Sequence, residues 1–177
     1  MNLEYIKAKT FCKHITDGTH DSPKYVNFGY HLVTSRFIKD NKVNLELSPY
    51  ISEFDYNKIN LRSKIEINDI LFSMIGTVGE VALVKSDDFA IKNIGLFRCK
   101  NEIDAKYLYY YLQSNLAKNL ITATITGSTQ HYLTLESLKN FEIPVFQNSF
   151  QQHIVDTIQT LFAIYLLLYL QVLCSRP

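Results

Sequence analysis

The stretch KHITDGTHDSPKY, residues 13–25, concentrates side chains that could do chemistry. Two histidines and two aspartates fall within eight positions of it: His14, Asp17, His20 and Asp21. Imidazoles and carboxylates at this density are typical of metal-dependent hydrolases, whose ions bind nitrogen and oxygen ligands. A polar loop that contacts DNA phosphates and base edges has a similar composition. The stretch therefore poses a choice between a metal site and a binding loop.

The spacing within this stretch argues against a metal site. His14 and His20 are six positions apart, which matches neither the HExxH motif nor any pair of ligands one turn apart on a helix. The Asp-Gly and Ser-Pro dipeptides are typical of turns. Two interpretations remain. One is a solvated turn whose aspartates cap backbone N–H groups, and the other is a DNA-facing loop in which Lys24 and the histidines meet phosphates. No bound metal is expected.

A second polar stretch, GSTQHYL at residues 127–133, has the residue types of a DNA contact. Its glycine permits a close approach to a backbone, and Ser128 and Thr129 can donate to phosphate. Gln130 can pair with adenine through two hydrogen bonds. The alternative is a turn that connects two helices, and the stretch taken alone favours that alternative.

An acidic constellation offers an enzymatic alternative. Asp104 and Lys106 form an acid-x-lysine half-motif like that of nucleases, and Asp87 and Asp88 lie upstream. Asp104 also opens an expected helix, where N-capping alone explains an aspartate. The chain contains no P-loop, no GxGxxG, no GxSxG and no Asn-Pro-Pro-aromatic motif. The residues therefore favour a binding protein, with no catalytic residue and no cofactor, over a metal-dependent nuclease.

Strands and turns are expected over most of the first 100 residues. β-Rich runs occur at YHLVTSRFI, NDILFSMIGTVGEVALVKS and FAIKNIGLFRCK, and Gly76 and Gly79 allow the chain to reverse within the second run. A helix is expected over DAKYLYYYLQSNLAKNLI, with Asp104 as its N-cap, followed by a short helix LESLKNF and a strand EIPVF. The elements together predict an α+β fold.

A C-terminal helix is expected from Asn148, which can cap it, with Gln151 in the capping-box position. One face is apolar and the other polar up to Thr160, but LFAIYLLLYLQVLC is apolar all round. A membrane span is disfavoured, since these 14 residues fall short of the roughly 20 that a span needs. The apolar segment instead predicts a homodimer through the C-terminal helix.

Composition limits the class of protein. The 177 residues, 47% of them apolar and 20% charged, fit one globular domain. A net charge of +1 excludes a strongly basic nucleic-acid binder, so any DNA contact must come from a local patch. Cys12, Cys99 and Cys174 have no metal-ligand spacing and are expected to be reduced thiols of a cytoplasmic protein. The N-terminus lacks the apolar core of a signal peptide.

Taken in order, several stretches resemble one family. The series is DGTHDSPKY, HLVTSRFI, INDILFSMIGTVGEVALV, IKNIGLFRCK, YLYYYLQS, TGSTQHYLTLESLKNFEIPVF and QQHIVDTI. It resembles a target-recognition domain of the DNA specificity subunit of type I restriction–modification systems, over about residues 4–160. The resemblance implies a mixed α/β domain with a twisted, barrel-like sheet over residues 1–147. It also implies that residues 148–177 begin the family's conserved spacer helix.

The family implies partners that carry the catalysis. Its specificity subunits usually hold two recognition domains, each reading half of a split double-stranded DNA target. Modification subunits methylate adenine with S-adenosylmethionine, and the restriction subunit translocates and cuts DNA with ATP. The resemblance therefore implies a non-catalytic, cytoplasmic subunit that has no cofactor and no membrane partner. This chain departs from the family in two ways: it has one recognition domain, as a half-subunit would, and its helix loses the charged Glu/Lys pattern after about Thr160. A frameshifted or truncated gene would produce such a tail, and the alternative function is then that of a truncated remnant that no longer assembles.

Ten polar or aromatic residues in or beside expected loops are the candidate DNA contacts. The family reads different sequences through variable loops, so residues that match its motifs are candidates for scaffold as well as for base readout. On this resemblance, residues 13–25 form a structural and DNA-facing loop rather than a metal site. The ten candidates are His20, Lys24, Tyr25, Arg36, Thr77, Lys92, Asn93, Thr129, Gln130 and His131.

Overall fold

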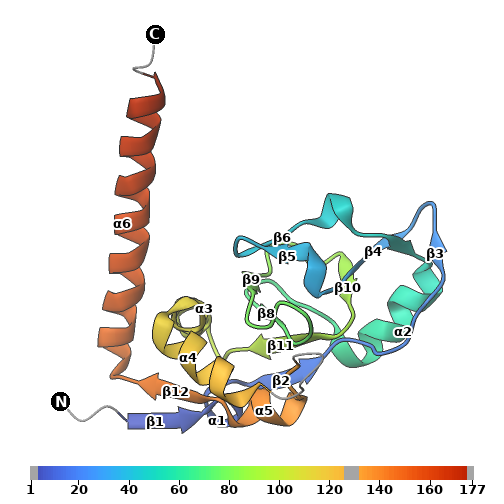
Figure 1. The fold of residues 1–177 in the computed structure, drawn as a ribbon, viewed down its shortest axis with the longest axis horizontal. Helices are drawn as coiled ribbons and strands as arrows, with labels where there is room; N and C mark the ends of the chain where they lie inside the picture. Colours follow the sequence, from blue (N-terminus) through green and yellow to red (C-terminus); the bar gives the residue numbers. More distant parts are fainter. Residues whose placement is uncertain (1–3, 126–131, 175–177) are drawn as a thin grey trace.

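A computed structural model describes residues 4–125 and 132–174 of the chain. Figure 1 shows a long C-terminal helix that rises from one end of the molecule, beside a body of sheets and shorter helices. The described strands form two four-stranded sheets and two two-stranded sheets.

The central sheet is antiparallel and has the strand order β2-β11-β8-β9. Along β8, Ile70 and Phe72 belong to a core that the sheet shares with the helices, whereas Leu71 belongs to a second core. Because alternate residues of a strand point to opposite faces, both faces of this sheet are buried. That burial explains why the sequence shows unbroken apolar runs here. The strands are β2 (His14–Asp17), β8 (Ile70–Ser73), β9 (Val81–Leu83) and β11 (Ile94–Arg98).

A second sheet has the order β10-β4-β7-β3, in which β10 and β4 run parallel and the other pairs antiparallel. Its Val33 and Phe89 pack in the second core with Leu71 of the central sheet, so the two sheets share apolar side chains. Ile59 of the helix α2 (Glu53–Ser63) packs on this sheet with Leu32. The strands are β3 (Tyr25–Val26), β4 (Tyr30–Val33), β7 (Tyr50–Ile51) and β10 (Phe89–Ile91).

Short strands and turns of helix complete the sheet layer. β1 (Glu4–Lys7) pairs with β12 (Glu142–Val145), and β5 (Ile38–Lys39) pairs with β6 (Lys42–Val43). Two 3₁₀ turns, η1 (Ser35–Phe37) and η2 (Leu45–Leu47), flank the β5–β6 pair. The expected α+β class is confirmed. The described strands form several open sheets around shared cores rather than one closed barrel.

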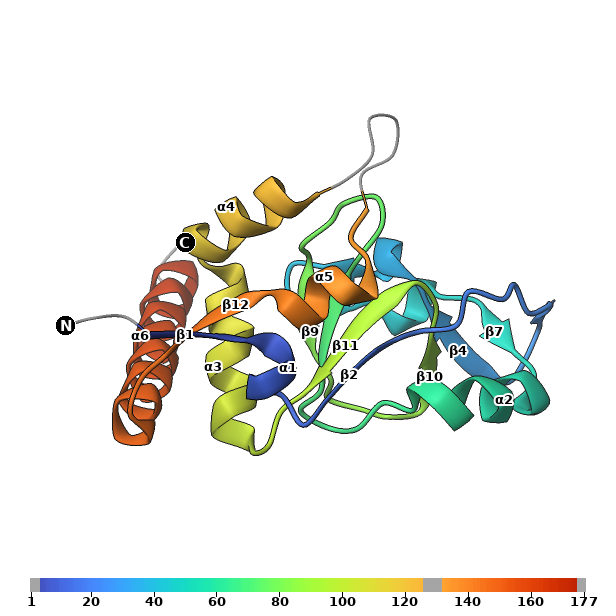
Figure 2. The same cartoon turned by 90° about the horizontal axis from the view of Figure 1, so that it is seen from below.

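Helices cover one face of the central sheet, as Figure 2 shows, and three of them are capped at their N-termini by side chains. Asn101, not Asp104, is the N-cap of the helix that begins at Glu102, and its side chain accepts the N–H of Asp104. The single helix expected here is broken at Ser114, because that hydroxyl accepts the N–H of Ala117 and starts a new helix. The helices are α1 (Ala8–Phe11), α3 (Glu102–Gln113), α4 (Asn115–Thr124) and α5 (Leu135–Asn140).

The C-terminal helix α6 (Asn148–Cys174) begins as the carbonyl of Gln147 accepts the N–H groups of Phe150 and Gln151. Its first turns are packed, since Gln151 and Val155 are buried and α6 lies against α3. From Leu161 to Leu168 its side chains are exposed. Within the described residues, no helix has both the length and the apolar character that crossing a membrane requires.

Two tyrosines fasten α3 to β12, next to the base of α6. The hydroxyl of Tyr107 donates to the carbonyl of Pro144 at 2.7 Å, and that of Tyr111 donates to the carbonyl of Glu142 at 3.0 Å. Burial raises the pKa of both phenols, that of Tyr111 to about 12. The folded protein therefore keeps these phenols protonated at pH values at which the unfolded chain begins to lose the protons.

We expect stability to fall as the pH rises from about 10, the ordinary tyrosine pKa, towards about 12, because the stability linked to a raised acid pKa is lost in that window. Urea unfolding at about pH 9 and about pH 11 measures the loss. Tyr111→Phe should lower the free energy of unfolding by about 0.5–1.5 kcal/mol at the lower pH. It should also reduce the loss on going to the higher pH. Equal pH dependence in the two proteins would contradict this assignment.

Candidate nucleic-acid interface

The DGTH segment, residues 17–20, lies very close to the connection between β10 and β11. Gly18 donates its N–H to the carbonyl of Ile94 at 2.8 Å, and Thr19 donates to that of Ile91 at 3.0 Å. A Cβ on Gly18 would lie 2.4 Å from the Ile91 oxygen, closer than carbon and oxygen can approach. The Asp-Gly pair predicted as a turn is therefore a contact between two backbones, and glycine is required for space rather than for a left-handed conformation.

A hydrogen-bonded network surrounds the end of β2. The carboxylate of Asp17 is buried, and it accepts hydrogen bonds from Arg62 of α2 and from Nε2 of His20. The other ring nitrogen of His20, Nδ1, lies 2.7 Å from Oδ1 of Asn93. His20 is thus held between the end of one strand and the turn that joins β10 to β11.

The Lys92–Asn93 turn is the point where three polar loops meet. Asn93 has a φ of 54°, a left-handed conformation that asparagine tolerates better than most residues. Ser35, in the loop after β4, donates its hydroxyl to the Asn93 carbonyl at 3.4 Å. Lys92 donates its ammonium to the hydroxyl of Ser22, in the loop after β2. The structure therefore brings together three of the candidate contacts: His20, Lys92 and Asn93.

Two more candidates lie around a neighbouring cavity of about 390 Å³, which Arg36 and Thr77 line together. The guanidinium carbon of Arg36 sits 4.5 Å from the centre of the Phe37 ring. Ile75, beside Thr77, forms an isolated bridge with Tyr132. Three further candidates, Thr129, Gln130 and His131, lie outside the described residues.

Lys24 and Tyr25 lie apart from the Lys92–Asn93 turn, at the start of β3. β3 pairs with β7 and forms an outer strand of its sheet. Both side chains are exposed. β3 lies at the end of the molecule away from α6 (Figure 1).

The acidic residues of the nuclease alternative are not gathered into a site. The side chain of Asp104 is bonded to Asn101, and Lys106 pairs with Glu102 within the same helix at 2.6 Å. Among residues 4–125 and 132–174, no three His, Cys, Asp or Glu side chains form a group that could hold a metal ion. Asp87 and Asp88 therefore do not combine with Asp104.

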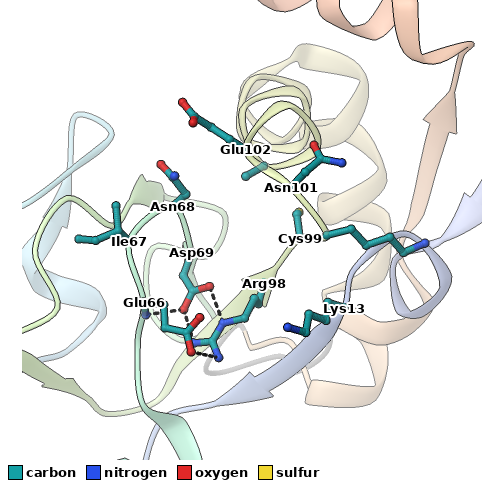
Figure 3. Close-up of a pocket in the computed structure, with 11 residues that line it drawn as sticks. Lys13, Glu66, Ile67, Asn68, Asp69, Arg98, Cys99, Asn101 and Glu102 are labelled. Atoms are coloured by element: carbon teal, nitrogen blue, oxygen red, sulfur yellow. Dashed lines mark hydrogen bonds and ion pairs between the residues drawn. The ribbon is translucent and has the colours of Figure 1, made fainter.

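Figure 3 shows a different cavity, of about 240 Å³, with an ion-pair network at its base. Asp69 accepts two hydrogen bonds from Arg98, at 2.9 and 2.7 Å, and a third from the N–H of Glu66. Arg98 also pairs with the Glu66 carboxylate at 2.8 Å and donates to the carbonyl of Lys64. Each of the three guanidinium nitrogens thus has a partner within the protein, so this network ties β11 to the loop before β8.

The pKa values of this pair shift for opposing reasons. Burial raises the pKa of the Asp69 carboxyl and so disfavours its charge, whereas the hydrogen bond that Arg98 donates to Asp69 raises the pKa of Arg98 and favours its charge. The pair of hydrogen bonds from Arg98 to Asp69 favours the ionised pair, because a planar guanidinium matches the geometry of a carboxylate. The cavity is therefore built mainly for stability, with Lys13 and Cys99 on its wall.

Comparison with known proteins identifies the family. The sequence profile of the type I restriction modification DNA specificity domain matches residues 19–168. The chain belongs to this family. The match extends eight residues beyond Thr160, where the charged helix pattern was expected to end.

Individual relatives support the assignment. The chain is 28% identical over 145 residues to the type I restriction enzyme EcoBI specificity subunit of Escherichia coli, covering 76% of this chain and 29% of that one. The type I restriction–modification S subunit from M. genitalium has a TM-score of 0.62 at 19% identity over 90% of this chain. The HsdS subunit from Thermoanaerobacter tengcongensis has a TM-score of 0.64 at 18% identity over 92% of this chain. This chain spans 38% of each of those two structures.

Sequence reasoning missed the helix α2 and with it Arg62, the partner of Asp17. A local signal was present, since Ser52 and Asp55 have capping-box spacing and do bond to each other. The pairing with Asp17 had no local signal, because the two residues are 45 positions apart.

Gly18→Ala should lower the free energy of unfolding by about 1–3 kcal/mol, because the new methyl group overlaps the Ile91 carbonyl and the Lys92–Asn93 turn must move. Urea unfolding gives the stability, and the NMR signals of the His20 ring report the movement of the turn.

Gly76→Ala is the matched control. A Cβ at Gly76 meets nothing within 4 Å, so this variant carries only the strain of its left-handed backbone. The His20 signals should stay in place in Gly76→Ala and shift in Gly18→Ala. Unshifted signals in Gly18→Ala would show that the close approach does not position the turn.

Proposed function

We propose that this chain reads one half of a split DNA target for a type I restriction–modification complex and has no catalytic activity of its own. The observation that carries the proposal is the meeting of three polar loops at Lys92 and Asn93, in a chain of the DNA specificity family. Phosphate contacts would set the register on DNA, and side chains of these loops would reach base edges. Methylation and cleavage would come from modification and restriction subunits, and the complex would work in the cytoplasm.

The same proposal divides the chain at the start of α6. Residues 1–147 would form the recognition domain, and residues 148–177 would begin the helix through which the chain joins other subunits. The packing of α6 supports this division, since the buried Gln151 and Val155 fasten the helix and its later turns extend away from the body. The candidate Tyr25 lies on β3, with Lys24 directly before it, and β3 is at the other end of the molecule (Figure 1).

The isolated chain should bind DNA weakly and gain sequence preference when modification subunits are added, because one nearly neutral domain makes few phosphate contacts. Selection of bound duplexes from a random pool, with and without modification subunits, measures the affinity and the sequence preference. Tight sequence-specific binding by the chain alone would contradict the proposal. Cutting of DNA by the pure chain with Mg²⁺ would favour the nuclease alternative.

Lys24→Ala should weaken binding to all DNA sequences about equally and lower the slope of log K against log[salt] by about 0.9, as the loss of one phosphate contact does. Lys9→Ala is the matched control, because it removes the same charge from the exposed face of α1. A Lys24 variant that behaves like the Lys9 variant would remove Lys24 from the interface.

We further propose that two copies of the chain associate through the second half of α6. Seven large apolar side chains between Leu161 and Leu168 each expose between 45% and 67% of their surface. Leaving such a side chain in water forgoes roughly 1.5–3 kcal/mol. An antiparallel pair of α6 helices in a two-fold dimer covers much of this surface and places two recognition domains on one assembly.

In sedimentation at micromolar concentration, the full chain should form a dimer, and a chain that ends at Thr160 should be a monomer. The shortened chain keeps the buried Gln151 and Val155, so its domain retains the packing of α6 on α3. Leu61→Gln is the control, because Leu61 is an exposed leucine on α2, and this variant should still dimerise. A monomeric full chain would refute the dimer.

A further inference from the structure

A buried carboxylate holds two basic side chains at the surface beside the Lys92–Asn93 turn. The side chain of Asp17 is only 6% exposed, whereas those of Arg62 and His20 are 56% and 63% exposed. Removing a carboxylate from water is unfavourable unless donors satisfy it, and here both donors come from these two side chains. Asp17 therefore restricts Arg62 and His20 to one arrangement at the end of α2.

Arg62 retains donors for another group. A guanidinium carries five N–H donors in a planar fork. Within the described part of the chain, Asp17 is the hydrogen-bond partner found for Arg62, and it is reached through Nη2. Arg98 is the contrasting case, because each of its guanidinium nitrogens has a partner in the protein. Arg62 is thus held through Nη2, and its other N–H groups can donate to a ligand.

Arg62 borders a cavity of about 280 Å³ between α2 and the loop after β2. Lys58, one turn earlier on α2, also borders it and lies 3.5 Å from the carboxylate of Asp21. Both side chains of that pair are more than 60% exposed, so an incoming anion can displace Asp21 at little cost. With Asp17 satisfied from within, the donors that line the cavity beside the exposed Asp21 carboxylate are Arg62, Lys58 and the hydroxyl-bearing Thr19.

We propose that this cavity binds a phosphodiester group of the DNA backbone, with Arg62 as the main donor and Asp17 as its positioning residue. The inference rests on the proposed function and adds a site to it. A planar guanidinium suits two phosphate oxygens, and Lys58 adds a point charge beside them. His20 links the cavity to Asn93 at 2.7 Å, so a phosphate bound here fixes the register of the DNA relative to the Lys92–Asn93 turn.

The test is the salt dependence of DNA binding by the full chain assembled with modification subunits. Arg62→Gln should weaken binding to a cognate and to an unrelated duplex by the same factor, and it should lower the slope of log K against log[salt] by about 0.9. Arg62→Lys should restore the slope but not the whole affinity, because an ammonium replaces the charge and not the fork. Lys9→Ala, on α1, should leave both quantities unchanged.

Asp17→Asn tests the positioning role, since it keeps the shape of the side chain and removes its charge. It should weaken DNA binding several-fold when Arg62 is present and have little further effect in the Arg62→Gln background. Thermal unfolding of each variant is measured to check that the variant is folded. If Asp17→Asn does not fold, the exposed Arg62→Gln and Arg62→Lys pair decides the question by itself.

The outcomes separate this site from the proposed function. An unchanged salt slope in Arg62→Gln, in a complex that keeps its sequence preference, overturns the phosphate site and leaves the proposed function intact. A wild-type complex without any DNA binding overturns both. A loss of affinity in Arg62→Gln that is confined to the cognate duplex would make Arg62 a base-reading residue and would also overturn the phosphate site.

Discussion

The arrangement of the proposed DNA-binding edge depends on the backbone contact between Gly18 and Ile91. Two N–H groups of the DGTH segment donate across it, and the missing Cβ allows the two chains to come that close. The contact joins the end of β2, in the central sheet, to the strand β10 of the second sheet. The same approach brings His20 within hydrogen-bonding distance of Asn93.

The strands and most helices were predictable because their signals are local. Runs such as NDILFSMI are apolar on both faces of a buried sheet, and the structure places β8 within that run. Boundaries were less predictable, since side chains compete with helical hydrogen bonds at a few positions. Ser114 interrupts the expected helix, and Asn101 replaces Asp104 as the cap of α3. The choice depends on which of several polar residues adopts an extended backbone, and the composition does not encode that choice.

The candidate interface was predictable in its residue types and not in its pairings. The density of His and Asp in residues 13–25 indicated either a metal site or a binding loop, and their spacing argued against the metal site. What the segment does is decided by Arg62 and Asn93, which are 45 and 73 positions away from their partners. The fold alone brings such residues together. The same carboxylates could cap a turn, bind an ion or anchor an arginine.

The helix α6 shows how one element can serve two environments. Up to Thr160 it needs a single apolar stripe, because the body of the protein covers one side of it, and Val155 is buried there. Beyond that point no described element lies beside it, yet its side chains are apolar on every face. A helix that faced only water would be selected for polar residues on most of its surface. The apolar second half therefore fits a helix that is covered in an assembly. Because α6 stands at the opposite end of the molecule from β3, such an assembly leaves the end that carries β3 uncovered.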